Sequence, residues 1–288
     1  MSRKFESAHA LRQALTDRLR AESTNTGQSF NTLLTKVLIE RFLARLFSKP
    51  DAPWLLKGGY AFELRYRPKA RTTRDVDVTV PGISGATLKA RLEHVRDELS
   101  KAAELNLGDH MKFVIGPPKG DLSAPPLGGT TFPVEVRLAD KVFGNFRVDV
   151  AFGDAIVGEP EELVGASSLA FAGIEPARVL AISKAQQFAE KLHAYTLPWD
   201  DRENTRVKDL VDLALLIERG ELKPNEVQVA VATTFKTRAR QPVPAKLPVP
   251  PASWTAEYAA LATEAGIAVN TADAGFELLD RYWRSLCE

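Results

Sequence analysis

The stretch that decides the fold is Asp75-Val76-Asp77-Val78-Thr79-Val80. Its strict alternation and its β-branched residues predict a strand, in which Asp75 and Asp77 point to the same face. Their backbones are then about 7 Å apart. Two like charges held so closely are unfavourable unless a cation lies between them, and such oxygen ligands suit Mg²⁺. The alternative interpretation is a solvated strand face, because an Asp-x-Asp pair also arises by chance.

The residues before this strand predict a turn that could bind phosphate. The apolar run Trp54 to Leu56 is typical of a short buried strand, and it stops at Gly58-Gly59. Glycines let the backbone approach a phosphate closely, and free N–H groups at the start of a helix bind anions. Residues 61–66 fit one or two helical turns. Taken alone, the two glycines predict only a turn.

A basic segment joins the turn to the strand. Residues 65–74 contain five cations and no acid. A basic loop beside a metal site suits a triphosphate or a nucleic-acid backbone, so we expect Arg71 and Arg74 to contact a nucleotide. The alternative is a solvated basic loop.

A third carboxylate is expected on a neighbouring strand. Residues 146–152 alternate, so that Val148 and Val150 face one side and Asp149 faces the other. Asp149 could complete a metal site or act as a base toward an attacking hydroxyl. A surface aspartate on an edge strand fits the spacing equally well.

Composition limits the class of protein. The 288 residues are 44% hydrophobic and 26% charged, which excludes a disordered or disulfide-stapled chain. With 38 Lys and Arg against 37 Asp and Glu, no overall charge indicates a polyanionic partner. The single cysteine, Cys287, excludes a multi-cysteine metal site and fits a reducing compartment. We find no secretory signal and no membrane span, and therefore expect a cytoplasmic protein.

The pattern of elements changes along the chain. Helices are predicted over residues 5–21, 28–48 and 86–105, with Ser29 as an N-cap, and further strands over 113–115, 132–138 and 146–152. After about residue 175 helical patterns dominate: 178–196, 206–218, 224–234, 254–265 and 273–286. A proline-rich segment over 240–253 should run extended across the surface. We therefore predict a mixed α/β (α+β) fold, with a sheet core over residues 1–175 and an all-helical domain over residues 176–288.

Four blocks of sequence resemble the AbiEii/MenT family of nucleotidyltransferase toxins, within the DNA polymerase β-like nucleotidyltransferase superfamily. They are residues 55–64 with Lys-Gly-Gly, residues 71–78 with Asp-Val-Asp-Val, Phe188-Ala-Glu-Lys-Leu-His-Ala194 and Arg206-Val-Lys-Asp-Leu-Val-Asp-Leu213. The resemblance covers residues 54–217 and implies a nucleotidyltransferase-type mixed sheet. Two features depart from the superfamily pattern. The turn has Gly-Gly in place of Gly-Ser, and 15 residues separate Gly59 from Asp75.

The resemblance implies a role for each matching residue. Asp75 and Asp77 would hold Mg²⁺, with Mn²⁺ as an alternative ion. Gly58 and Gly59 would cradle the phosphates of an NTP, and Lys191 would pair with its triphosphate.

The last block would supply an essential acid, Asp209. Supporting side chains in this block would be Arg206, Lys208 and Asp212. The spacing is compatible with these roles, because Arg206, Asp209 and Asp212 recur every three residues on one helix face. Lys184 lies two helical turns before Lys191, so both lysines could face the same nucleotide.

The function implied is transfer of nucleotides from an NTP to the 3′ end of tRNA by a toxin with a cognate antitoxin, which would block translation. Nine Lys and Arg against four Asp and Glu in residues 1–50 fit an RNA acceptor. One alternative is a small-molecule nucleotidyltransferase of the antibiotic-modifying kind. Another is a catalytically silent module that binds nucleic acid or a partner. We expect Asp77→Ala and Lys191→Ala to abolish transfer without unfolding the protein.

Overall fold

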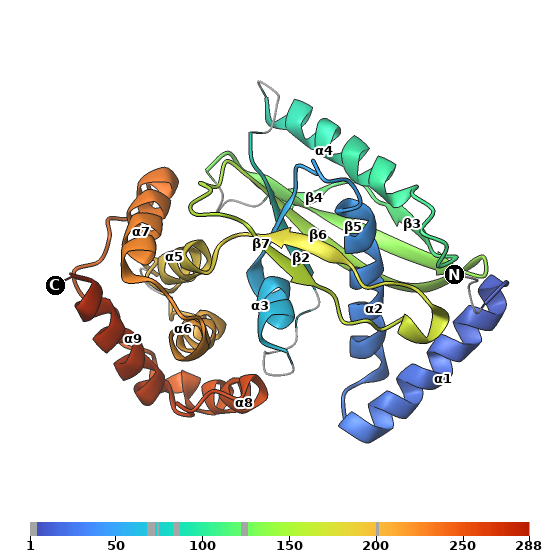
Figure 1. The fold of residues 1–288 in the computed structure, drawn as a ribbon. Helices are drawn as coiled ribbons and strands as arrows, with labels where there is room; N and C mark the ends of the chain where they lie inside the picture. Colours follow the sequence, from blue (N-terminus) through green and yellow to red (C-terminus); the bar gives the residue numbers. More distant parts are fainter. Residues whose placement is uncertain are drawn as a thin grey trace. The chain divides into compact units, whose positions relative to one another are not determined.

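The chain is described by a computed structural model that covers residues 5–67, 73, 75–82, 87–121, 126–199 and 202–287 (Figure 1). It divides into two compact units, and neither unit is one continuous stretch of sequence. The first unit comprises Met1–Leu56, Thr73–Gly153 and Glu162–Leu180. The second comprises Lys57–Thr72, Asp154–Glu161 and Ala181–Glu288.

A mixed sheet, most of which belongs to the first unit, has the strand order β3-β5-β6-β2-β1-β8-β7, and β4 pairs with β5. The strands are β1 (Leu55–Lys57), β2 (Asp75–Val80), β3 (Lys112–Ile115), β4 (Lys119–Asp121), β5 (Gly129–Leu138), β6 (Lys141–Phe152), β7 (Glu161–Val164) and β8 (Arg178–Ala181). β5 and β6 form an antiparallel hairpin, whereas β2 pairs with β6 in parallel. The sheet confirms the predicted mixed α/β fold.

Three helices of the first unit, α1 (Ala8–Thr26), α2 (Phe30–Leu46) and α4 (Leu88–Ala103), pack with the sheet and with one another. Ser29 caps α2 as predicted, because its hydroxyl accepts a 3.1 Å hydrogen bond from the Thr32 amide. The Phe42 ring lies 5.5 Å from that of Phe146, so α2 covers the face of β6 that carries Phe146. Successive side chains of a strand alternate, and Asp149 therefore points to the opposite face.

The second unit contains α3 (Gly58–Tyr66) and five further helices: α5 (Lys184–Tyr195), α6 (Val207–Arg219), α7 (Pro224–Arg238), α8 (Thr255–Ala265) and α9 (Ala272–Cys287). Their apolar faces meet in one core, which includes Leu192, Leu213 and Leu279. The four helices predicted after residue 205 are confirmed. The proline-rich segment is tied to this core, because Leu247 is buried and Tyr195 donates a 2.6 Å hydrogen bond to the carbonyl of Pro248.

The helix predicted over residues 178–196 is wrong in its first part. Residues 178–181 form β8, and α5 begins only at Lys184, where the Ser183 hydroxyl caps it by accepting from the Gln186 amide. Strands β4 and β7 were also not predicted; β4 interrupts the loop expected between residues 116 and 129. Runs of three or four residues carry too little periodicity to distinguish a buried strand from a helical turn. No helix within the described residues is long and apolar enough to cross a membrane.

A buried ion network stabilises the first unit. The fully buried carboxylate of Asp109 accepts hydrogen bonds of 2.8 and 2.6 Å from Arg45 and of 2.9 Å from Arg41. Burial alone would raise the pKa of Asp109, but the hydrogen bonds and charges of Arg45 and Arg41 hold it below its usual value. The carboxylate is therefore ionised at neutral pH, and its contribution to stability is lost only as the pH falls through this lowered pKa.

Asp109→Ala is expected to lower the free energy of unfolding by about 3–5 kcal/mol, because it leaves two buried guanidinium groups without their anion. Urea unfolding at pH 7 measures the loss. Glu162→Ala is the matched control, since it breaks an ion pair to Arg178 in which both side chains are largely exposed. Equal effects of the two substitutions would contradict the assigned role of Asp109.

Candidate active site

Three carboxylates lie on one face of two neighbouring strands of the first unit. Asp77 on β2 is directly paired with Asp149 on β6, and Asp75 is paired with Arg147. Paired residues on adjacent strands point to the same side of a sheet, and so do residues two apart on one strand. Asp75, Asp77 and Asp149 therefore share the face opposite to that covered by α2.

Asp75 and Asp149 on this face each contact a polar side chain. Arg147 Nε lies 3.4 Å from Asp75 Oδ1, with both side chains about half exposed or more. Asp149 Oδ1 accepts a 2.6 Å hydrogen bond from the Thr131 hydroxyl on β5. Burial and the nearby charge of Asp75 raise the pKa of Asp149, although the Thr131 hydrogen bond and Arg147 oppose the shift. A cation on this face would relieve the repulsion between the carboxylates.

The donor set fits Mg²⁺ that arrives with a nucleotide. Within the described ranges, no three His, Cys, Asp or Glu side chains are arranged so that they could hold a metal ion. Mg²⁺, however, is usually bound by one or two carboxylates together with substrate phosphates and water. Asp75 and Asp77 would supply two hard oxygen ligands of this kind, and phosphate oxygens and water would complete the shell.

The Gly58-Gly59 turn opens a helix of the second unit. Gly58 has a φ of 63°, a left-handed conformation that glycine adopts without strain, and it is the first residue of α3. Lys57 occupies the N-cap position, but its side chain does not cap the helix. The first N–H groups of α3 have no partner within the helix, and such groups favour a bound anion. The local geometry therefore suits a phosphate at Gly58 and Gly59.

Lys191 is held by the last sequence block. Its ammonium group lies 2.8 Å from Asp209 Oδ1 and 2.7 Å from Asp212 Oδ2. The Asp212 side chain is only 1% exposed and that of Lys191 15%. Arg206 Nη1 lies 3.9 Å from Asp209, so the residues at intervals of three do share a face of α6. Within the second unit Lys191 thus neutralises two buried acids, a structural role that the sequence did not indicate.

The remaining predicted residues are less closely grouped. Lys184 is the first residue of α5 and lines a pocket of about 290 Å³, with Glu159 and Glu221 also in its wall. The side chains of Arg206 and Lys208 are exposed. Arg71 and Arg74 lie outside the described residues.

The comparison with protein families now decides the identity. The family model of the nucleotidyl transferase AbiEii toxin, a type IV toxin–antitoxin system, matches residues 41–279. The chain belongs to the AbiEii family. It is therefore a nucleotidyltransferase toxin, and membership implies a nucleotide substrate and a cognate antitoxin.

The solved structure of MenT4 agrees with the fold of this AbiEii-family toxin. MenT4, a nucleotidyltransferase toxin from Mycobacterium tuberculosis H37Rv, is 15% identical, with 96% of this chain and 89% of MenT4 covered at a TM-score of 0.59. The antibiotic-resistance factor ANT(2'')-Ia is 17% identical over 71% of this chain and 94% of its own, but its TM-score of 0.37 is too low to support an inference. No curated protein matches the chain.

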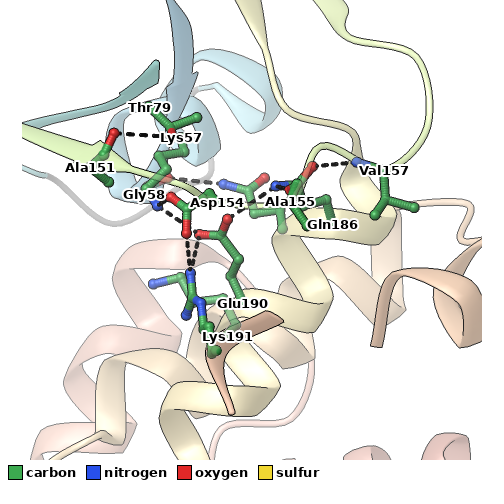
Figure 2. A network of polar contacts seen from close by, with 12 residues as sticks. Lys57, Gly58, Thr79, Ala151, Asp154, Ala155, Val157, Gln186, Glu190 and Lys191 are labelled. Carbon is green, nitrogen blue, oxygen red and sulfur yellow. Dashed lines mark hydrogen bonds and ion pairs between the residues drawn. The ribbon is translucent and has the colours of Figure 1, made fainter. Parts of the chain in front are cut away.

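Sequence reasoning missed a second charged cluster of the toxin, formed by Lys57, Asp154, Glu190 and Arg238 (Figure 2). Lys57 and Glu190 occur in the family-like blocks, each directly before a predicted site residue. The positions of Lys57 and Glu190, directly before Gly58 and Lys191, are the signal by which the sequence could have indicated them. Asp154 and Arg238 carried no signal, because nothing in their neighbourhood in the sequence indicates their partners.

His193 of α5 is buried and neutral. Burial, and then the charges of Arg238 and Arg240, lower its pKa to about 4, and its Nε2 atom has no hydrogen-bond partner among the described residues. An unfolded chain binds this proton near pH 6.5. The contribution of neutral His193 to stability is therefore complete above about pH 6.5 and declines as the pH falls toward 4.

We expect the wild type to lose stability between pH 7 and pH 5, with about 1–2 kcal/mol of the loss due to His193. His193→Leu should remove that part, because leucine cannot bind the proton. Urea unfolding of both proteins at the two pH values measures the difference. An identical pH dependence in the variant would show that His193 is not the group responsible.

Proposed function

We propose that this toxin transfers a nucleotidyl group from an NTP to the 3′ end of tRNA and thereby blocks translation in the cytoplasm. The observation that carries the proposal is the shared face of Asp75, Asp77 and Asp149 on two paired strands. Carboxylates in this arrangement are suited to Mg²⁺ and to proton abstraction, the two requirements of phosphoryl chemistry at a hydroxyl.

The chain's own residues would act as follows. The 3′-hydroxyl oxygen of the acceptor attacks the α-phosphorus, Asp149 accepts the hydroxyl proton, and the bond between the α-phosphorus and the bridging oxygen breaks to release pyrophosphate. The raised pKa of Asp149, caused by burial and by Asp75, makes it a stronger base than an exposed aspartate. Mg²⁺, bound by Asp75 and Asp77, would supply Lewis-acid stabilisation of the phosphate charge.

The second unit would hold the triphosphate. The N–H groups of Gly58 and Gly59 at the start of α3 would donate hydrogen bonds to the phosphate oxygens. Lys191 would neutralise the charge that develops on the leaving pyrophosphate. Asp209 and Asp212, which contact Lys191 in the structure, would keep its ammonium group oriented.

The cations of residues 1–50 support an RNA acceptor less than their number predicts. Arg41 and Arg45 are buried against Asp109, and Arg12 donates hydrogen bonds to the carbonyls of Leu138, Lys141 and Val142. These three arginines stabilise the first unit. A tRNA acceptor is therefore supported mainly by the family and by the basic sequence of residues 65–74 before β2.

The test incubates the toxin with Mg²⁺, total tRNA and each of the four α-³²P-labelled NTPs in turn. We expect one or more nucleotides to label intact tRNA but not tRNA whose 3′ diol has been oxidised with periodate. Labelling of oxidised tRNA would place the acceptor hydroxyl elsewhere. Transfer only to an added aminoglycoside would contradict the proposed RNA acceptor, but it would still agree with nucleotidyltransferase activity.

A further inference from the structure

The buried cluster of Lys57, Asp154, Glu190 and Arg238 has no part in the proposed chemistry. We infer that it is a positioning network, which fixes the Gly58-Gly59 turn relative to Lys191 on α5. The inference rests on the proposed function in one respect, namely that the turn and Lys191 act on the same triphosphate. All the residues concerned belong to the second unit.

The network consists of two cations and two anions, of which Figure 2 labels Lys57, Asp154 and Glu190. The ammonium group of Lys57 contacts Asp154 and lies 3.2 Å from Glu190 Oε2. Arg238 Nη2 lies 3.1 Å from Asp154 Oδ1 and 3.3 Å from Glu190 Oε2. Each acid thus contacts both cations, and the charges balance.

Two members of the network are sequence neighbours of predicted site residues. Lys57 directly precedes Gly58, and Glu190 directly precedes Lys191. The ion pair between Lys57 and Glu190 therefore ties the residue before the turn to the residue before the lysine. A displacement of Lys57 would therefore move Gly58, and a displacement of Glu190 would move Lys191, because the residues of each pair are directly bonded neighbours in the chain.

A second, independent contact joins the same two segments. Gln187, one helical turn before Lys191, donates a 2.9 Å hydrogen bond from its side chain to the carbonyl of Gly58. The Gln187 side chain is in turn held by Arg65, which also binds the Ile182 carbonyl and lies 2.7 Å from Glu161. Both the side chain before the turn and the backbone of the turn are thus attached to α5.

Stability alone is a poor explanation for this cluster. Burying four charges carries a large desolvation cost, and apolar side chains of similar volume often stabilise a protein as well or better. What a fully paired polar network adds is a single defined geometry. Burial disfavours the charged form of Lys57, yet Glu190 and Asp154 raise its pKa above the usual value, so Lys57 remains charged.

The test measures kcat and KM for the NTP in Glu190→Gln, which keeps the shape of Glu190 and removes its charge. We expect kcat to fall about 10- to 100-fold, since errors of about 1 Å in position cost that much, and KM to change less than about threefold. The turn can still bind the NTP, whereas the transition state needs both the turn and Lys191. Lys57→Met should act similarly, and Lys57→Arg, which restores the cation, should recover most of the lost kcat.

Asp109→Asn is the matched control, because it disturbs a buried ion network of the same kind whose members all belong to the first unit. All proteins are assayed well below their melting temperatures, so that the same fraction is folded. A fall in kcat for Glu190→Gln no larger than that for Asp109→Asn would overturn the inference. In that case the proposed function would still be supported if the wild type transfers the label and Asp77→Asn does not.

A second measurement applies even if the wild type labels no acceptor. Amide hydrogen exchange over residues 62–66 reports how firmly α3 is held behind the turn. We expect this exchange to be at least about tenfold faster in Glu190→Gln and unchanged in Asp109→Asn. Unchanged exchange in Glu190→Gln would contradict the positioning role, whatever the substrate of the toxin.

Discussion

Asp77→Asn is expected to lower kcat/KM for nucleotidyl transfer by at least about 10³-fold. Asp77 is the residue of β2 that pairs directly with Asp149, and asparagine at this position is a neutral and much weaker ligand for Mg²⁺. Loss of several kcal/mol of charge stabilisation in the transition state corresponds to a factor of this size. Steady-state transfer of label from the NTP to tRNA measures it.

The stability of Asp77→Asn should be equal to that of the wild type or slightly higher. Three carboxylates on one face repel one another, and the substitution removes one charge. Asp140→Asn is the control for activity, since the Asp140 side chain is 88% exposed on the turn between β5 and β6. A variant at position 77 that keeps a tenth of the activity, or that unfolds, would show that Asp77 is not a metal ligand.

Lys191→Met is expected to abolish transfer and also to lower the stability of the protein. The sequence alone predicted the loss of transfer but no loss of stability. The substitution removes the ammonium group that contacts the buried carboxylates of Asp209 and Asp212, at a cost of about 3–5 kcal/mol. The loss of activity should reach about 10²-fold or more, as for other charges aimed at a transition state. Urea unfolding and the transfer assay, run on the same preparation, give the two quantities.

A double variant separates the two roles of Lys191. Lys191→Met with Asp212→Asn also removes the charge of the more buried of the two acids and should recover a large part of the lost stability. Transfer should stay abolished, because the cation for the triphosphate is still missing. Recovery of transfer together with stability would show that Lys191 is only structural.

Strands β2 and β6 and the carboxylate face that they share could be predicted because their signals are local. In β2, every second residue from Val76 is an apolar side chain of the core, and the alternation fixes both the strand and the shared face of its aspartates. Asp149 follows from the same argument on β6. The pairing of Asp77 with Asp149 needed only that β2 and β6 be neighbours.

The ion networks could not be predicted, because their partners are far apart in the sequence. Lys57 and Asp154 are separated by 97 residues, and Arg238 and Asp154 by 84. No local pattern states which of 38 cations meets which of 37 acids. The spacing of Asp209 and Asp212 did predict a shared helix face. The contact of both acids with Lys191 could not be predicted, because it depends on how α5 packs against α6.

The central claim is that the toxin joins the α-phosphate of an NTP to the 3′ end of tRNA. The most direct measurement compares α-³²P-labelled and γ-³²P-labelled forms of the same NTP as donors to intact tRNA, with Asp77→Asn as the inactive control. We expect only the α-label to appear on tRNA, and only with the wild type, while the γ-label leaves in the pyrophosphate. Transfer of the γ-label to tRNA, or α-labelling that persists in Asp77→Asn, would contradict it.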